Sequence, residues 1–166
     1  MARTFLTHND LSETIRKKIV KLLNENLVDA IHLSLQGKQA HWNVKGIYFY
    51  QFHELFDKFY DEASDWSDLL AERVVQLGAL AEANLDSVAK RTRLPSYSLD
   101  LTDGLDHVKA LIKSLSIFCK NIRSSIDESQ KIGDAGTADL FTEISRSADK
   151  FLWFLESHLV QHKKLK

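Results

Sequence analysis

Residues 41–72 read HWNVKGIYFYQFHELFDKFYDEASDWSDLLAE, and they contain the most regular helical pattern of the chain. From about Tyr48 onward, its apolar residues recur at alternating steps of four and three, the spacing of a helix face that packs in a bundle. These residues are Phe52, Phe56, Phe59, Ala63, Trp66 and Leu70. The pattern predicts one long helix whose apolar face lies in the core of a helical bundle.

A second set of side chains lies on another side of the same predicted helix. These residues are His53, Asp57, Asp68 and Glu72. At about 100° per residue they span an arc of roughly 100°, and the centre of that arc lies about 150° from the centre of the apolar face. All four are residue types that bind metals, and they are expected to point away from the core.

The spacing of this set predicts a site that two chains share. His53 and Asp57 are one turn apart and can bind one ion together. Asp57 and Asp68 are about 16 Å apart along the axis, too far for one ion with bonds near 2 Å. The four positions are also symmetric about the middle of the helix. An antiparallel pair of these helices, related by a twofold axis, would therefore bring the first two residues of one chain to the last two of the other.

The same residues have a plainer interpretation. Glu54, Asp61 and Asp65 lie on or near the same side. An acidic helix face of this kind is usually just exposed to solvent. On spacing alone, the metal site and the solvated acidic face both remain open.

The stretch and its flanks resemble the Dps family (DNA-binding protein from starved cells, the mini-ferritins). The segments that carry the resemblance are KQAHWNVKG (38–46), HELFD (53–57) and DLLAER (68–73). The family motif H-x11-H-x3-D-x10-D-x3-E is matched without a gap at His41, His53, Asp57, Asp68 and Glu72. The resemblance extends over nearly the whole chain, through LTHNDLS (6–12), LPSYSLDL (94–101) and TADLFTEISRSADKFLWFLESHL (137–159).

This resemblance implies an all-α fold, a ferritin-like four-helix bundle with one long crossover connection that holds a short helix. The chain is expected to form one domain over residues 1–166, with a short N-terminal arm (1–9) and a basic C-terminal tail (162–166). Asp10 or Ser12 is the expected cap of the first helix, and Thr137 that of the last. The short helix is predicted over residues 85–90.

The composition agrees with long helices. Among 166 residues there are six Gly and one Pro, and the formal net charge is −1, which gives no global basic field for nucleic acid. The single Cys119 forms no internal disulfide and is expected to be buried. No run of about 18 apolar residues and no apolar signal core is present. A cytoplasmic protein without a membrane span is therefore expected.

The resemblance also implies a function: iron storage and detoxification that protects against oxidative stress. As a ferroxidase-type oxidoreductase, the protein would oxidise Fe(II), preferably with hydrogen peroxide, and store ferric mineral in a hollow homododecamer. The ligands would be His41, His53 and Asp57 of one chain with Asp68 and Glu72 of its mate. Such a donor set suits Fe2+/Fe3+, and Zn2+ or Mn2+ are alternatives at the same site. The chain contains no Glu-x-x-His motif, which counts against a di-iron centre inside one bundle.

Three further roles follow from the resemblance, and the first two have a plainer interpretation beside them. Trp42 would donate electrons to the oxidation centre, or it only packs there. Asp134 and Asp139 would line an acidic iron channel at a threefold axis, or they favour the dipole of a helix N-terminus. The third role is DNA binding by the basic tail, through Lys163, Lys164 and Lys166.

Two other classes of protein remain as alternatives. One is a DNA-compacting, nucleoid-associated Dps protein in which the metal has a minor role. The other is a helical interaction module with no redox chemistry. The five-residue motif argues against the second class, because bundle packing alone does not demand these residue types at these spacings.

Overall fold

The computed structural model describes residues 4–160, which form five α-helices and, within that range, only two isolated β-bridges. The helices are α1 (Glu13–Asn43), α2 (Phe49–Gln76), α3 (Leu85–Arg91), α4 (Gly104–Ile132) and α5 (Ala135–Ser157). The predicted all-α class and the short helix in the connection are confirmed. None of the described helices combines the length and apolar character needed to cross a membrane.

Helices α1 and α2 form an antiparallel hairpin that carries the predicted site. The Ser12 hydroxyl accepts a hydrogen bond from the Ile15 amide at 3.3 Å and caps α1, as one of the two expected residues. The tight turn after α1 contains Gly46 with φ of 111°, a left-handed conformation that favours glycine. Within the hairpin, Gly37 of α1 lies directly against the Phe59 ring of α2. The absence of a side chain there lets the two helices approach closely.

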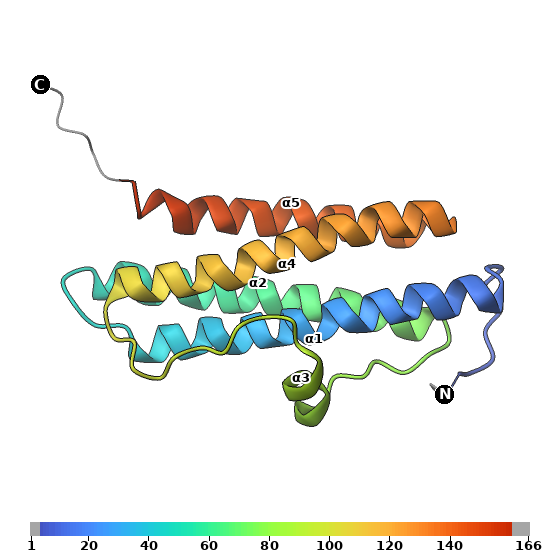
Figure 1. Cartoon of the computed structure of the whole chain (residues 1–166), viewed down its shortest axis with the longest axis horizontal. Helices are drawn as coiled ribbons and strands as arrows, with labels where there is room; N and C mark the ends of the chain where they lie inside the picture. Colours follow the sequence, from blue (N-terminus) through green and yellow to red (C-terminus); the bar gives the residue numbers. More distant parts are fainter. Residues whose placement is uncertain (1–3, 161–166) are drawn as a thin grey trace, which may run out of the picture.

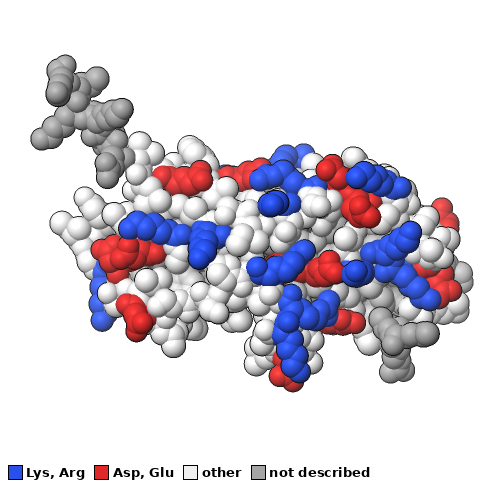
Figure 2. Space-filling model, viewed as in Figure 1, with Lys and Arg blue, Asp and Glu red and all other residues white. Residues whose placement is uncertain are grey.

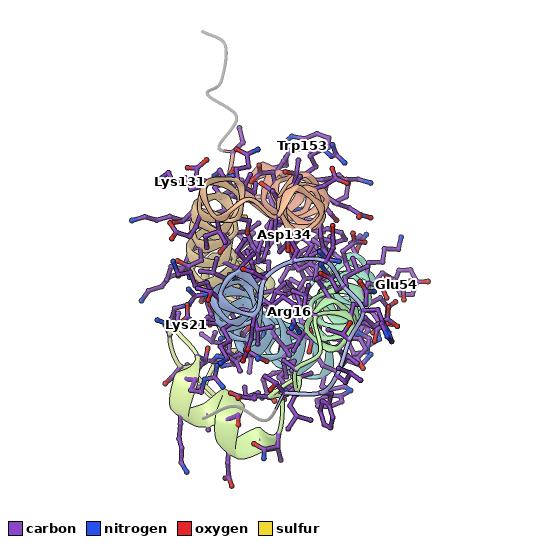
Figure 3. All side chains as sticks on the ribbon, turned by 90° about the vertical axis from the view of Figure 1, so that its right-hand side faces the viewer. Arg16, Lys21, Glu54, Lys131, Asp134 and Trp153 are labelled. Atoms are coloured by element: carbon purple, nitrogen blue, oxygen red, sulfur yellow. The ribbon has the colours of Figure 1, made fainter. Side chains whose placement is uncertain are left out.

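The second hairpin, α4 and α5, packs on the first to complete the four-helix bundle (Figure 1). Figure 3 looks along the bundle and shows the two hairpins as two layers, with α3 outside them. Helices α2 and α4 run in the same direction, so the connection between them must return along the full length of the bundle (Figure 1). This is the long crossover that the sequence predicts.

The core confirms the predicted apolar face of α2. All six residues of that face are at most 5% exposed, and Val74 extends it by one more position. Cys119 of α4 is also completely buried, as predicted. Burial raises the pKa of its thiol to about 12.

A buried carboxylate fixes the crossover to the bundle. Asp29 of α1 has no exposed surface and accepts hydrogen bonds at 2.8 Å from both the backbone amide and the Nε of Arg93. The Arg93 guanidinium also reaches the Asn26 side-chain oxygen at 3.0 Å. Because the buried charge is paired and hydrogen-bonded, this clamp holds the connection along α1.

The described part of the N-terminal arm lies across the end of α2. The Phe5 amide donates to the Gly78 carbonyl at 2.8 Å, and Thr4 forms an isolated antiparallel bridge with Ala79. The arm is thus attached to the start of the crossover by backbone hydrogen bonds.

Candidate metal centre

Two histidines face each other where α1 ends and α2 begins. The rings of His41 and His53 are stacked, with centroids 3.6 Å apart and planes 24° apart. His41 Nδ1 lies 2.8 Å from the His53 carbonyl, and His53 Nδ1 lies 2.9 Å from the His41 carbonyl. A carbonyl oxygen only accepts, so each Nδ1 carries a proton and donates it. In the neutral rings, both Nε2 atoms therefore keep the lone pair that binds a metal.

Asp57 lies beside this pair, one turn along α2 from His53. Its Oδ1 is 3.7 Å from His41 Nδ1 and is also bonded by the Nζ of Lys38. The hydrogen bond from Lys38 lowers the pKa of Asp57, and the nearby imidazoles act in the same direction. The three predicted ligands of one chain are thus neighbours, with an anionic carboxylate among them, although the three are not arranged around a common point that could hold a metal ion.

Lys38 pairs with Asp57, a contact that was not predicted from the sequence. It lies three residues before His41 on α1, which places both side chains on the same face of that helix. This spacing within the KQAHWNVKG segment is the signal by which it could have been found. The lysine also stacks over the Tyr60 ring, with Nζ 4.5 Å from the ring centroid.

The other two predicted ligands are not part of this cluster in the single chain. Asp68 and Glu72 lie further along α2 and are exposed. Glu54, on the same helix, points out of the bundle in the end-on view (Figure 3). Within residues 4–160 of one chain, no group of three or more His, Cys, Asp or Glu side chains is arranged to hold a metal ion.

Asp68 lines an acidic hollow between α2 and α5. The hollow has a volume of about 350 Å³, and its other carboxylates belong to Glu62, Asp65 and Glu143. Ser147 of α5 donates a hydrogen bond to Glu62 there. The acidic surface beside Asp68 therefore continues from the outer side of α2 toward α5.

The remaining predicted residues have distinct surroundings. Trp42 follows His41 directly and is 67% exposed. Asp134 is buried, whereas Asp139 is exposed on the first turns of α5. Lys163, Lys164 and Lys166 lie outside the described residues.

Asp134, and not Thr137, caps α5. The Asp134 carboxylate accepts hydrogen bonds from the Thr137 amide at 3.0 Å and from its hydroxyl at 2.6 Å. It also pairs with the Arg73 guanidinium at 3.0 Å, which ties the end of α2 to the start of α5. Figure 3 shows Asp134 on the inner side of the α4–α5 layer. The expected cap at Thr137 is wrong because the carboxylate three residues earlier already accepts the amide that needs a partner.

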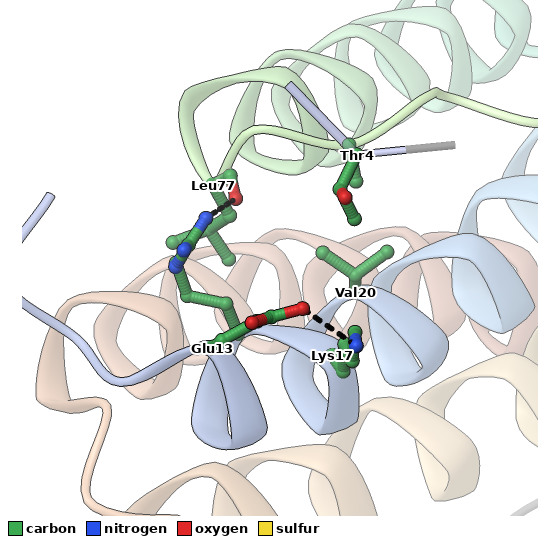
Figure 4. Close-up of a pocket in the computed structure, with 7 residues that line it drawn as sticks. Thr4, Glu13, Lys17, Val20 and Leu77 are labelled. Carbon is green, nitrogen blue, oxygen red and sulfur yellow. Dashed lines mark hydrogen bonds and ion pairs between the residues drawn. The ribbon is translucent and has the colours of Figure 1, made fainter. Parts of the chain in front are cut away.

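A second hollow lies at the far end of the hairpin from the histidines (Figure 4). It has a volume of about 540 Å³ and lies between Thr4 of the arm, the first turns of α1 and Leu77. The Glu13–Lys17 ion pair of 2.6 Å is at its rim, and Arg16 donates to the Leu77 carbonyl at 3.0 Å. Its polar groups thus pair with each other, and none of the predicted ligands lines it.

Surface charge is mixed on the face shown in Figure 2. Lys and Arg side chains alternate there with Asp and Glu, and basic groups gather over the short α3. Two of that helix's basic residues, Lys90 and Arg91, are in its last turn, where they complement the helix dipole. The described part of this face offers no continuous basic stripe of the kind that follows a DNA backbone.

Comparison with known proteins agrees with this architecture. Residues 20–165 match the family described as "Ferritin-like domain". The chain is 45% identical over 157 residues to the "DNA protection during starvation protein" of Agrobacterium fabrum, covering 95% of this chain and 97% of that one.

Two solved structures show the same fold over nearly the full length. DpsC from Streptomyces coelicolor matches with a TM-score of 0.91 at 28% identity, covering 100% of this chain and 96% of that chain. Dps from Microbacterium arborescens in its high iron form matches with a TM-score of 0.85 at 29% identity, covering 90% and 97%. Sequence and fold together show that the chain belongs to the Dps family of ferritin-like proteins.

Proposed function

We propose that this protein oxidises Fe(II) at sites shared by twofold-related chains and stores the ferric product inside a hollow dodecamer. One chain would supply His41, His53 and Asp57, and the partner's Asp68 and Glu72 would complete each site. The observation that carries the proposal is the reciprocal hydrogen bonding of the two imidazoles to backbone carbonyls. This arrangement fixes the proton on Nδ1 of both rings and leaves the Nε2 lone pairs available to an ion.

The donor set explains why such a site would favour oxidation. Carboxylates stabilise Fe(III) more than Fe(II), because the attraction grows with the charge of the ion. Each Fe(II) gives up one electron, and one hydrogen peroxide takes up two electrons and two protons to give two water molecules. A paired two-electron reduction of this kind releases no hydroxyl radical. Iron would thus be removed together with the oxidant that makes it harmful.

Three other residues have proposed roles around this reaction. Trp42 follows His41 in the chain and is exposed, and it would give an electron to an incompletely reduced oxidant. Asp139 is exposed and free to line an entrance for cations, if the start of α5 lies at a threefold axis. Asp134 would contribute to such an entrance mainly through its negative field, since its carboxylate already binds Arg73 and Thr137.

The test is anaerobic loading with Fe(II), followed by hydrogen peroxide, with ferric absorbance recorded over time. Wild type is compared with Asp68→Ala/Glu72→Ala, and the particle mass of both is measured. Fast oxidation in a dodecamer-sized particle, lost in an intact double variant, is the expected result. Equal, slow oxidation in both proteins would refute the shared site.

DNA compaction is the alternative, favoured by the name of the Agrobacterium relative and by the lysines of the tail. Protection of DNA does not itself require binding, because removal of iron and peroxide also protects it. A dodecamer would multiply weak phosphate contacts through avidity. The alternative predicts retention of DNA in gels at low salt, lost on removal of residues 162–166.

A further inference from the structure

The candidate ligand Asp57 already binds a cation of the chain itself. Lys38 Nζ contacts Asp57 Oδ1, and the Lys38 side chain is only 25% exposed. His41 Nδ1, which donates to the His53 carbonyl, lies 3.7 Å from the same oxygen. The ammonium thus neutralises the predicted carboxylate ligand that this chain places beside the two imidazoles.

A metal ion and the ammonium cannot both bind the Asp57 carboxylate without cost. Both cations would lie within bonding distance of one carboxylate group, and two cations this close repel each other. A lysine ammonium is a compact positive charge, and it binds a carboxylate at the same oxygen atoms as a metal ion does. Binding of an ion at Asp57 therefore requires Lys38 to move.

The ammonium has a second contact besides Asp57. From the same position, Lys38 Nζ lies 4.5 Å from the centroid of the Tyr60 ring, on the next turn of α2 from Asp57. The face of an aromatic ring attracts a cation, and at a partly exposed site the cation keeps most of its bound water. The flexible lysine stem can thus release Asp57 while its charge stays over Tyr60.

We infer that Lys38 is a specificity-determining residue of the metal site: it occupies Asp57 in the metal-free protein and competes with the entering divalent ion. The inference rests on the proposed function, because it takes Asp57 to be a ligand. A residue of α1 that does not belong to the five-residue motif would thus control the affinity of the site for metal. The competition favours ions of higher charge and disfavours adventitious monovalent cations.

The test is titration of the metal-free assembly with Zn2+ in a calorimeter, which measures affinity without any oxidation. Lys38→Met removes the competing charge and keeps a side chain of similar length. It is expected to tighten Zn2+ binding by about tenfold, the order expected when a neighbouring charge is removed at a partly exposed site. Lys38→Arg keeps the cation and is expected to bind Zn2+ like the wild type.

Lys58→Met is the matched control, because it removes the same charge from the neighbouring position. Lys58 is exposed and forms no ion pair with any of residues 4–160. Its substitution is expected to change the Zn2+ dissociation constant less than about twofold. Equal tightening in the Lys58 and Lys38 variants would overturn the inference in favour of a general charge effect. Unchanged or weaker binding in Lys38→Met would overturn it as well.

A second pair of variants separates this inference from the proposed function. In an Asp57→Asn background, Lys38→Met is expected to lose its effect, because the ammonium no longer holds a ligand. Asp68→Ala/Glu72→Ala tests the shared site itself. If that double variant binds Zn2+ like the wild type, the proposed function fails. If it binds less but Lys38→Met behaves like the wild type, only the role of Lys38 fails.

Discussion

At the scale of single residues, Asp134 is expected to contribute strongly to stability. It caps α5, accepts two hydrogen bonds from Thr137 and pairs with Arg73. Asp134→Ala should lower the free energy of unfolding by about 2–3 kcal/mol, since a cap and a largely buried charge pair are lost together. Urea unfolding of the two proteins at neutral pH measures the difference.

The same carboxylate predicts a pH dependence with a definite sign. Burial works to raise the pKa of Asp134, but the hydrogen bonds from Thr137 and the charge of Arg73 outweigh it, so the pKa lies below its usual value. A lowered pKa gives stability that is present above the ordinary Asp pKa of about 3.9 and is lost as pH falls through the folded value. The difference between wild type and Asp134→Asn should therefore shrink in acid. Asp139→Asn, exposed on the same helix, should show little difference at any pH.

At the scale of helices, the α1–α2 hairpin depends on the close approach at Gly37. A Cβ at this position would lie 2.8 Å from Cδ1 of Phe59 and 3.4 Å from the Tyr60 amide nitrogen. Gly37→Ala should destabilise the fold by about 1–2 kcal/mol, because overpacking outweighs the gain in helix propensity. The thermal midpoint measures this loss.

A double variant tests the cause of that loss. Leu in place of Phe59 removes the ring that meets the new methyl group. Gly37→Ala and Phe59→Leu should therefore cost less together than the sum of the two single variants, by about 1 kcal/mol. Strict additivity would mean that the ring is not what resists the methyl group.

At the scale of the assembly, mixed particles can show whether two chains build each site. Chains with His53→Ala/Asp57→Ala and chains with Asp68→Ala/Glu72→Ala are each expected to be inactive alone. In a mixed dimer, one of its two sites receives intact residues from both chains. Random mixing at equal amounts should thus restore about one quarter of the wild-type oxidation rate.

Co-expression of the two variants, with the composition of the particles checked by mass spectrometry, provides the measurement. A site contained in one chain would give no recovery, because every chain in the mixture is defective. Recovery well above one quarter would indicate that one half of the ligand set is dispensable.

The helices and the core could be predicted from the sequence because they depend on local periodicity. The face of α2 from Phe52 to Leu70 is buried at every predicted position, and the connection contains the short helix. The predicted ligands His41 and His53 lie together for the same reason, since a hairpin brings the end of one helix to the start of the next. Their role as ligands, with Asp68 and Glu72, stays a prediction.

What the sequence did not reveal depends on contacts across elements. The clamp between Asp29 and Arg93 joins residues 64 positions apart, and no spacing rule connects them. The competition of Lys38 for Asp57 likewise depends on how α1 and α2 lie against each other. The cap of α5 was misassigned to Thr137 because its hydroxyl is suited to capping, and the pairing of Asp134 with Arg73 is visible only in the fold.

The burial of Cys119 has a consequence for durability. Burial raises the pKa of its thiol to about 12, so the thiol is protonated and unreactive at neutral pH. The only other sulfur in the sequence is that of Met1. Sulfur is the first target of peroxide in most proteins, and its higher oxidation states are irreversible. The fold thus keeps the one cysteine of the chain out of reach of oxidants until the chain unfolds.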